Sequence, residues 1–300
     1  MFITTIKPST FIKASMKAAV TSLVACTLIA CGGDTSNSNN APIINVLAPE
    51  MGAIQGRSVF SIKVSDHDLI PQAGVTAHLS PMMTMDEQRG GHMHSTPHTG
   101  CTETDSEGNA SCSVYFLMAS KMENGDVMGT WDLAFSLPDS EDVTTHFTPQ
   151  VKMAMGDTVL AQLKGGLDDQ ISAMGMTESR TYHLFNNGIT GSGDNRSVEL
   201  FIAAKESMKS FPTLTQNLIL SPGTDQQMSV DSIQVKVSSD NSNWINAAPQ
   251  GAGIWQATEI SGLNDTLYVS LTVNGEIKTR DGEVAGENNA SAIFTLSSNM

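Results

Sequence analysis

The stretch Gly129-Thr130-Trp131-Asp132-Leu133-Ala134-Phe135-Ser136-Leu137 alternates large apolar residues with small or polar ones. Successive side chains of a β-strand point to opposite faces of a sheet. Trp131 and Phe135 therefore share one face with the leucines of this stretch, while Asp132 and Ser136 lie on the other. This period of two predicts a strand with one buried face and one solvated face.

The same alternation recurs along the chain and is strongest at 60–64, 75–79 and 112–118 in the first half. In the second half we expect a hairpin and then seven further strands, at 151–155 with 158–163, 182–185, 198–203, 218–220, 233–237, 254–257, 267–273 and 292–296. Turns rich in Gly, Pro, Asn, Asp and Ser separate them, and no long amphipathic helix competes. Short strands with such turns are typical of antiparallel sandwiches, so the sequence predicts an all-β chain of two β-sandwich domains in tandem.

The N-terminal segment has the pattern of a secretion signal. Three lysines precede an apolar run, 18–30, which is long enough for a signal-peptide core and too short to span a bilayer. Its end, Leu28-Ile29-Ala30-Cys31-Gly32, resembles the bacterial lipobox, in which cleavage leaves a lipidated cysteine as the first mature residue. Cys26 ends a second lipobox-like stretch, and an ordinary cleaved signal is the alternative. Because Cys31 has the longer apolar run before it, we expect lipidation there.

The residue after Cys31 is glycine and not aspartate, which by the same resemblance indicates the outer membrane, with the protein facing the periplasm of a Gram-negative cell. A polar Asp/Ser/Asn segment follows and has the composition of a flexible linker. The predicted organisation is a signal peptide at 1–30, a linker at 31–40, an N-terminal sandwich at 41–142 and a C-terminal sandwich at 143–300.

The charge balance excludes one class of partner. The 300 residues contain 16 Lys and Arg against 31 Asp and Glu, a formal net charge of -15 at pH 7. Nucleic acid is held by clusters of basic residues that this chain lacks, so we expect no nucleic-acid partner. The acidic loops do not follow the alternation of an EF-hand, so we favour solvated loops over calcium sites.

Cys101 and Cys112 flank a polar stretch with a Gly-Asn turn signal. In an oxidising compartment this arrangement predicts a disulfide that closes a loop or hairpin. Metal ligation by the two thiolates is the alternative, but their separation is not that of a C-x-x-C pair.

One segment of the first half is unusually rich in soft donors. Between residues 82 and 98 it carries four methionines, three histidines and two carboxylates, and Gly and Pro interrupt it. We interpret it as a loop that is too polar for a strand. Thioether sulfur suits Cu(I) and imidazole accepts Cu(II), so a site with both can hold copper in either oxidation state. A surface insertion whose methionines cap the sandwich is the alternative.

Taken together, a strand that runs into Pro-Met-Met, the Met/His segment and the closing strand at Gly129-Thr130-Trp131 resemble the YtkA/FixH-like family of extracytoplasmic immunoglobulin-like domains. The resemblance covers roughly residues 57–138. It implies an immunoglobulin-like sandwich that handles copper. The ligand candidates that it implies are Met82, Met83, Met85, His92 and His94, with Met93 and His98 as further donors.

The functional expectation is a copper-binding lipoprotein that carries, buffers or delivers copper, with a copper-delivery protein as a partner. No Gly-x-Ser-x-Gly elbow, H-E-x-x-H pair or phosphate-binding glycine loop is present in the sequence, so we expect no enzyme. The rival hypothesis is a structural or adhesive immunoglobulin-like module without a metal site. Zinc or nickel capture is a third possibility.

Overall fold

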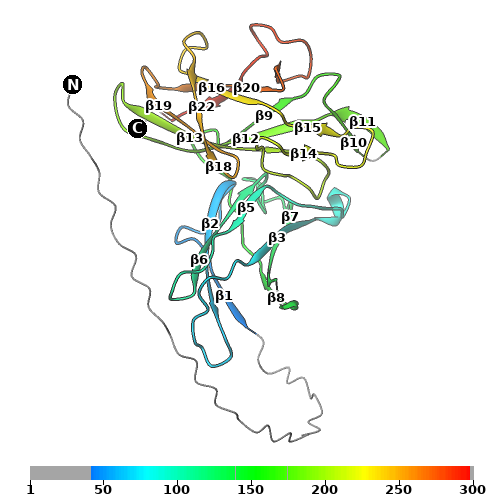
Figure 1. The fold of residues 1–300 in the computed structure, drawn as a ribbon, viewed down its shortest axis with the longest axis vertical. Helices are drawn as coiled ribbons and strands as arrows, with labels where there is room; N and C mark the ends of the chain where they lie inside the picture. The colour runs from blue at the N-terminus through cyan, green and yellow to red at the C-terminus, as the bar shows by residue number, and fades with distance from the viewer. Residues whose placement is uncertain (1–41, 139, 174, 298–300) are drawn as a thin grey trace, which may run out of the picture. The chain divides into compact units, whose positions relative to one another are not determined.

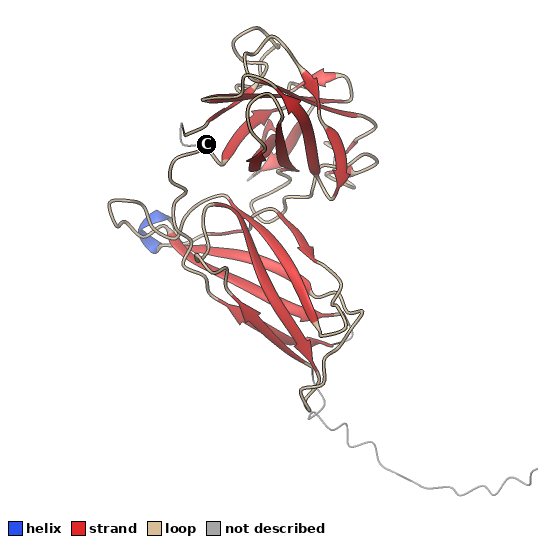
Figure 2. Ribbon diagram, turned by 90° about the vertical axis from the view of Figure 1, so that its left-hand side faces the viewer, coloured by secondary structure: helices blue, strands red, loops and turns tan. Residues whose placement is uncertain are grey.

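The computed structural model describes residues 42–138, 140–173 and 175–297, and Figure 2 shows that strands make up nearly all of their regular structure. In these ranges the helical element is one 3-10 turn, η2 (Glu87–Arg89). The predicted signal peptide and linker, with Cys26 and Cys31, lie outside the described residues. No helix within the described ranges is long and apolar enough to cross a membrane. The all-β prediction is confirmed.

The first immunoglobulin-like sandwich consists of two antiparallel four-stranded sheets (Figure 1). One has the order β1 (Ile43–Leu47), β2 (Gly56–Ser65), β6 (Asn109–Phe116) and β5 (His98–Cys101). The other has the order β4 (Met93–His94), β3 (His78–Met85), β7 (Gly129–Leu137) and β8 (Ser140–Phe147). Each sheet therefore joins strands that are distant in the sequence.

The opening stretch is β7, and its predicted faces are confirmed. Trp131, Leu133 and Phe135 are fully buried in the core of the first sandwich. The Trp131 indole packs edge-on against Phe116, and its Nε1–H donates to the carbonyl of Met118 at 3.2 Å. A buried indole needs such a partner because an unpaired N–H in the core is costly.

The second sandwich also has two large antiparallel sheets. The five-stranded one has the order β18 (Ala248–Gly251), β19 (Ile254–Ile260), β13 (Arg196–Ala204), β12 (Thr181–Thr190) and β9 (Leu160–Lys164). The other has the order β17 (Ile245–Asn246), β16 (Ile233–Ser238), β20 (Thr266–Val273) and β21 (Glu276–Ile277), and β22 (Ala292–Thr295) also pairs with β20. Two short hairpins complete it: β10 (Gln170–Ala173) with β11 (Met176–Ser179), and β14 (Ile219–Leu220) with β15 (Met228–Ser229).

The predicted disulfide is present. Cys101 of β5 lies directly opposite Cys112 of β6, and the two sulfurs are bonded. Between them the chain turns at Asp105, whose carboxylate accepts hydrogen bonds from the backbone N–H groups of Glu107 and Asn109. The bridge therefore fixes a hairpin in the first sandwich.

The hairpin expected at 151–163 is wrong. Residues 151–155 form no strand, because Val151 is buried in the first sandwich and Lys152 makes a parallel bridge with Ile54. Met155 is 82% exposed, and β9 begins only at Leu160 and pairs with β12. The apolar alternation of 151–155 thus reflects one inward side chain in a connecting segment. The predicted domain boundary after residue 142 falls within β8, which pairs with β7.

Both sandwiches belong to one compact unit and contact each other through aromatic side chains. Tyr115 of β6 stacks on Phe201 of β13, with ring centroids 3.7 Å apart and planes 14° apart. Phe185 of β12 packs beside both rings, at 5.2 Å from Tyr115. All three side chains are fully buried. We call Tyr115, Phe185 and Phe201 the aromatic junction.

Candidate functional site

The Met/His segment is partly strand and partly loop, and the expectation of a loop throughout is wrong. Strand β3 continues through Met85, and β4 returns beside it after η2. The Asp86 side chain accepts the backbone N–H of Gln88 and so caps the turn. The physical reason is that Met83 and Met85 occupy the inward positions of β3, where thioether side chains pack as ordinary apolar residues.

The pairing of β3 with β4 sorts the predicted ligands by face. Met83 lies opposite His94, and residues directly opposite each other in a sheet project to the same side. Met83, Met85 and His94 are all buried, whereas Met93 lies opposite Thr84 on the outer face and is 44% exposed. One face of this hairpin therefore gathers soft donors, and the other does not.

His94 is the centre of that face. Its Nε2 lies 3.3 Å from the Sδ of Met85, and its Nδ1 lies 3.1 Å from the carbonyl of Ser95. Its ring packs edge-on against Trp131, and the exposed His92 ring lies 6.5 Å away between centroids. The structure thus brings together Met85, His92 and His94 from the predicted set.

The protonation state of His94 determines what this contact can do. Burial lowers the pKa of the imidazole, an effect that the hydrogen bond to Ser95 opposes and the neighbouring His92 reinforces. A carbonyl can only accept, so Nδ1 carries the proton and neutral His94 presents the Nε2 lone pair to the thioether of Met85. Both atoms can therefore donate a lone pair to one soft metal ion bound between them.

The other predicted ligands lie elsewhere. Met82 is on the face of β3 opposite to Met83 and Met85, and Met83 is enclosed in the core. His98 is in β5 of the other sheet, where burial lowers its pKa and its Nδ1 has no hydrogen-bond partner. Within the described ranges no group of three or more His, Cys, Asp or Glu side chains is placed to hold a metal ion. That set comprises His, Cys, Asp and Glu side chains, and it leaves open sites that include a methionine thioether.

A cluster of buried charges in the second sandwich had no signal in the sequence. The carboxylate of Asp169 contacts Arg180 Nε at 2.8 Å, Lys278 Nζ at 2.6 Å and the Tyr182 hydroxyl at 2.6 Å. Arg180 also pairs with Glu206. We call these five residues the buried charge cluster. Its members are separated by up to 109 positions in the chain, so no local spacing indicates it.

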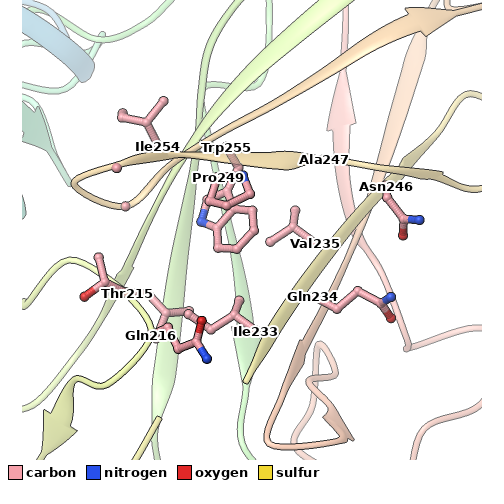
Figure 3. A pocket seen from close by; sticks show the side chains of 13 residues that line it. Thr215, Gln216, Ile233, Gln234, Val235, Asn246, Ala247, Pro249, Ile254 and Trp255 are labelled. Atoms are coloured by element: carbon pink, nitrogen blue, oxygen red, sulfur yellow. The ribbon is translucent and has the colours of Figure 1, made fainter. Parts of the chain in front are cut away.

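A cavity of about 380 Å³ lies in the second sandwich. Figure 3 shows the indole of Trp255 among its lining side chains. Thr215, Gln216, Gln234 and Asn246 provide its polar groups. None of its lining residues is ionisable, so the cavity itself offers no group for acid–base catalysis at neutral pH.

Neither a known protein family nor a curated protein matches this chain. Among solved structures it is similar to FdeC, an adhesin of Escherichia coli, with 12% identity over 87% of this chain and 65% of that one, and a TM-score of 0.24. It is also similar to InvD of Yersinia pseudotuberculosis, with 13% identity over 84% of this chain and 57% of that one, and a TM-score of 0.24. A third similar structure is domains 4–9 of the surface layer protein SbsC, with 12% identity over 86% of this chain and 32% of that one, and a TM-score of 0.21. The chain spans less than two thirds of each of these chains. At these TM-scores the likeness carries no argument about function.

The lowered pKa of His94 predicts a pH effect on stability. The unfolded chain takes up a proton on this residue near pH 6.5, whereas the folded protein does so only at lower pH. The free energy of unfolding should therefore fall as the pH decreases below about 6.5, and above that pH the contribution of His94 should be constant. Urea unfolding as a function of pH measures this, with His94→Gln as the comparison. An equal slope below pH 6.5 in the variant would contradict the assignment.

Proposed function

We propose that this chain is a non-catalytic structural or adhesive module of the bacterial envelope, in which two immunoglobulin-like sandwiches form one stiff tandem. The observation that carries the proposal is the aromatic junction. A tandem that only tethers two independent domains needs no buried contact between them, since a flexible linker is sufficient. Here three aromatic rings are removed from water at the contact.

The strand β6 explains why the junction is specific. Val114 and Phe116 point into the core of the first sandwich, and by alternation Tyr115 points outward. An outward tyrosine is normally solvated, yet Tyr115 is fully buried because the second sandwich covers it. Burial of an aromatic side chain contributes about 1.5–3 kcal/mol, and stacked pairs add about 0.5–1.5 kcal/mol.

Polar contacts surround the rings and fix how the two sandwiches meet. Asn187 donates from Nδ2 to the Tyr115 hydroxyl at 3.2 Å and to Glu199 at 3.0 Å. Arg57 of the first sandwich forms an ion pair with Glu199 at 3.5 Å. The backbone N–H of Ser95 also donates to the carbonyl of Met208 at 2.8 Å. An apolar centre with a polar rim is the usual anatomy of a specific protein interface.

The proposal includes attachment to the outer membrane through a lipid on Cys31, with the sandwiches on the periplasmic side. The support is the lipobox-like sequence and its following glycine. The acidic charge of the chain favours an acyl anchor over a basic patch, since anionic lipid repels it. The disulfide between Cys101 and Cys112 fits an oxidising compartment.

The stiff tandem predicts a narrow distance distribution between the sandwiches. Spin labels on Ser61→Cys of β2 and Asp225→Cys, both at exposed positions, would report it by pulsed electron resonance. Tyr115→Ala should broaden the distribution, because it removes the stacked ring and leaves a cavity at the contact. Tyr115→Phe is the matched control and should keep it narrow. A broad distribution in the otherwise unchanged chain would overturn the proposal.

A second candidate function, copper binding, is favoured by one specific observation, the contact of His94 Nε2 with Met85 Sδ. Bonds from a metal ion to nitrogen and sulfur are about 2.0 and 2.3 Å long, so donors at this separation can share one ion. His92 offers a third donor at the solvent-exposed end of the hairpin. The residues therefore fit a soft ion such as Cu(I), and the role would be carriage or delivery of copper to a partner protein.

Copper titration with a competing Cu(I) chelator tests this candidate. We expect one saturable Cu(I) per chain, and at least a tenfold weaker affinity in Met85→Leu and in His94→Gln. Met82→Leu and Met93→Leu are matched controls on the opposite face and should bind as the unchanged chain does. If the control variants lose as much affinity as Met85→Leu, or if no uptake occurs, the assignment is wrong. Zinc or nickel binding would instead leave affinity unchanged in Met85→Leu.

A further inference from the structure

Lys278 and Asp169 form an unusually close and dry pair in the second sandwich. The Nζ of Lys278 lies 2.6 Å from Oδ2 of Asp169, and each side chain is 1% exposed. Lys278 follows β21, where Thr279 bridges Lys164 of β9, and Asp169 lies in the turn before β10. The pair therefore joins the start of the second sandwich to a strand near its end.

The groups around this pair have complementary roles. Arg180 Nε donates to the other oxygen of the carboxylate, Oδ1, at 2.8 Å. The Tyr182 hydroxyl donates to Oδ2 at 2.6 Å, and burial raises the pKa of this phenol well above its ordinary value, so it stays protonated. Glu276 contacts the same Nζ as Asp169 and accepts the backbone N–H of Gly166 through its other oxygen.

The charges around Lys278 and Asp169 favour conversion of these two groups to neutral ones. Arg180 has a second carboxylate partner in Glu206, and Glu276 reaches solvent, with its side chain 41% exposed. Loss of the charges on Lys278 and Asp169 therefore leaves Arg180 paired and Glu276 hydrated. Burial of an ion pair is costly because two charges lose their water, whereas a neutral amide in the same place has only ordinary hydrogen-bonding needs.

We propose that Lys278 and Asp169 condense to an intramolecular isopeptide bond, with no cofactor and no second protein. The inference does not depend on the proposed function. Its basis is the position of a buried amine against a buried carboxyl group, between a base and two hydrogen-bond donors. Reacting groups held in such contact gain a large effective concentration, and exclusion of water opposes the reverse hydrolysis.

The step balances as follows. The Lys278 ammonium gives one proton to Asp169, and the resulting amine attacks Cγ of the neutral carboxylic acid. Arg180 holds the negative charge that develops on Oδ1. Glu276 accepts a second proton from Nζ and returns it to Oδ2, which leaves as water while Tyr182 holds it by a hydrogen bond. One N–C bond forms and one C–O bond breaks, and Nζ keeps one hydrogen as the amide N–H.

Such a bond would be a covalent cross-link within the second sandwich, as the disulfide is within the first. Both cysteines of the described residues are in the first sandwich, in the hairpin of β5 and β6. A bond from residue 169 to residue 278 would close a loop of more than a hundred residues, and loop closure stabilises a fold by restricting its unfolded chain. An isopeptide bond also resists reduction, which a disulfide does not.

Peptide mass mapping of the full, folded chain tests the proposal. After denaturation, reduction and trypsin digestion, we expect peptides 165–180 and 237–280 to appear joined and lighter than their sum by one molecule of water. Cleavage after Lys278 should be absent because its amine is acylated. Recovery of 165–180 and 237–278 as separate peptides, with normal cleavage after Lys278, would overturn the proposal.

Variants separate a bond from a salt bridge. Lys278→Arg keeps the positive charge but should give no joined peptide, and Glu276→Gln should slow the appearance of the joined species at least tenfold. The internal control is Lys205 with Glu178, an ion pair at 2.9 Å that solvent reaches, which should remain uncrosslinked. A joined peptide at Lys205 as well would indicate non-specific chemistry and would overturn the assignment to the buried site.

Discussion

The burial of Tyr115 is the constraint on which the arrangement of this protein depends. A strand has two faces, and in a sandwich one of them is normally left to water. In β6 the inner face packs in the core of the first sandwich, and on the outer face Tyr115 is covered by Phe185 and Phe201 of the second. The strand that carries half of the disulfide is thus also the strand that joins the two sandwiches.

Much of the fold could be predicted because side-chain alternation is a local property. Trp131 and Phe135 face inward, and their period alone indicates this. The same rule failed where an apolar residue serves a connection, as Val151 does. In the Met/His segment, the preference for a ligand-bearing loop over methionines that cap the sandwich hid the strand pattern. Met83 and Met85 are strand residues of the inner face, so their alternation was a strand signal that their chemistry obscured.

The candidate sites are harder to predict from the sequence than the strands, because they depend on which strands become neighbours. The contact of His94 with Met85 follows from the hairpin of β3 and β4, which is local, and the composition of the segment pointed to it. The buried charge cluster depends on β9, β12 and β21, which meet only in the folded sandwich. Asp169 and Lys278 look like ordinary surface residues in the sequence, since charged side chains are rarely buried without a partner.

The central claim is that the two sandwiches behave as a single structural unit. Differential scanning calorimetry of the folded chain tests it most directly. If the aromatic junction couples the sandwiches, unfolding should appear as one transition whose calorimetric and van 't Hoff enthalpies agree. Two separate transitions, each unaffected by Tyr115→Ala, would show that the sandwiches are independent and would contradict the account.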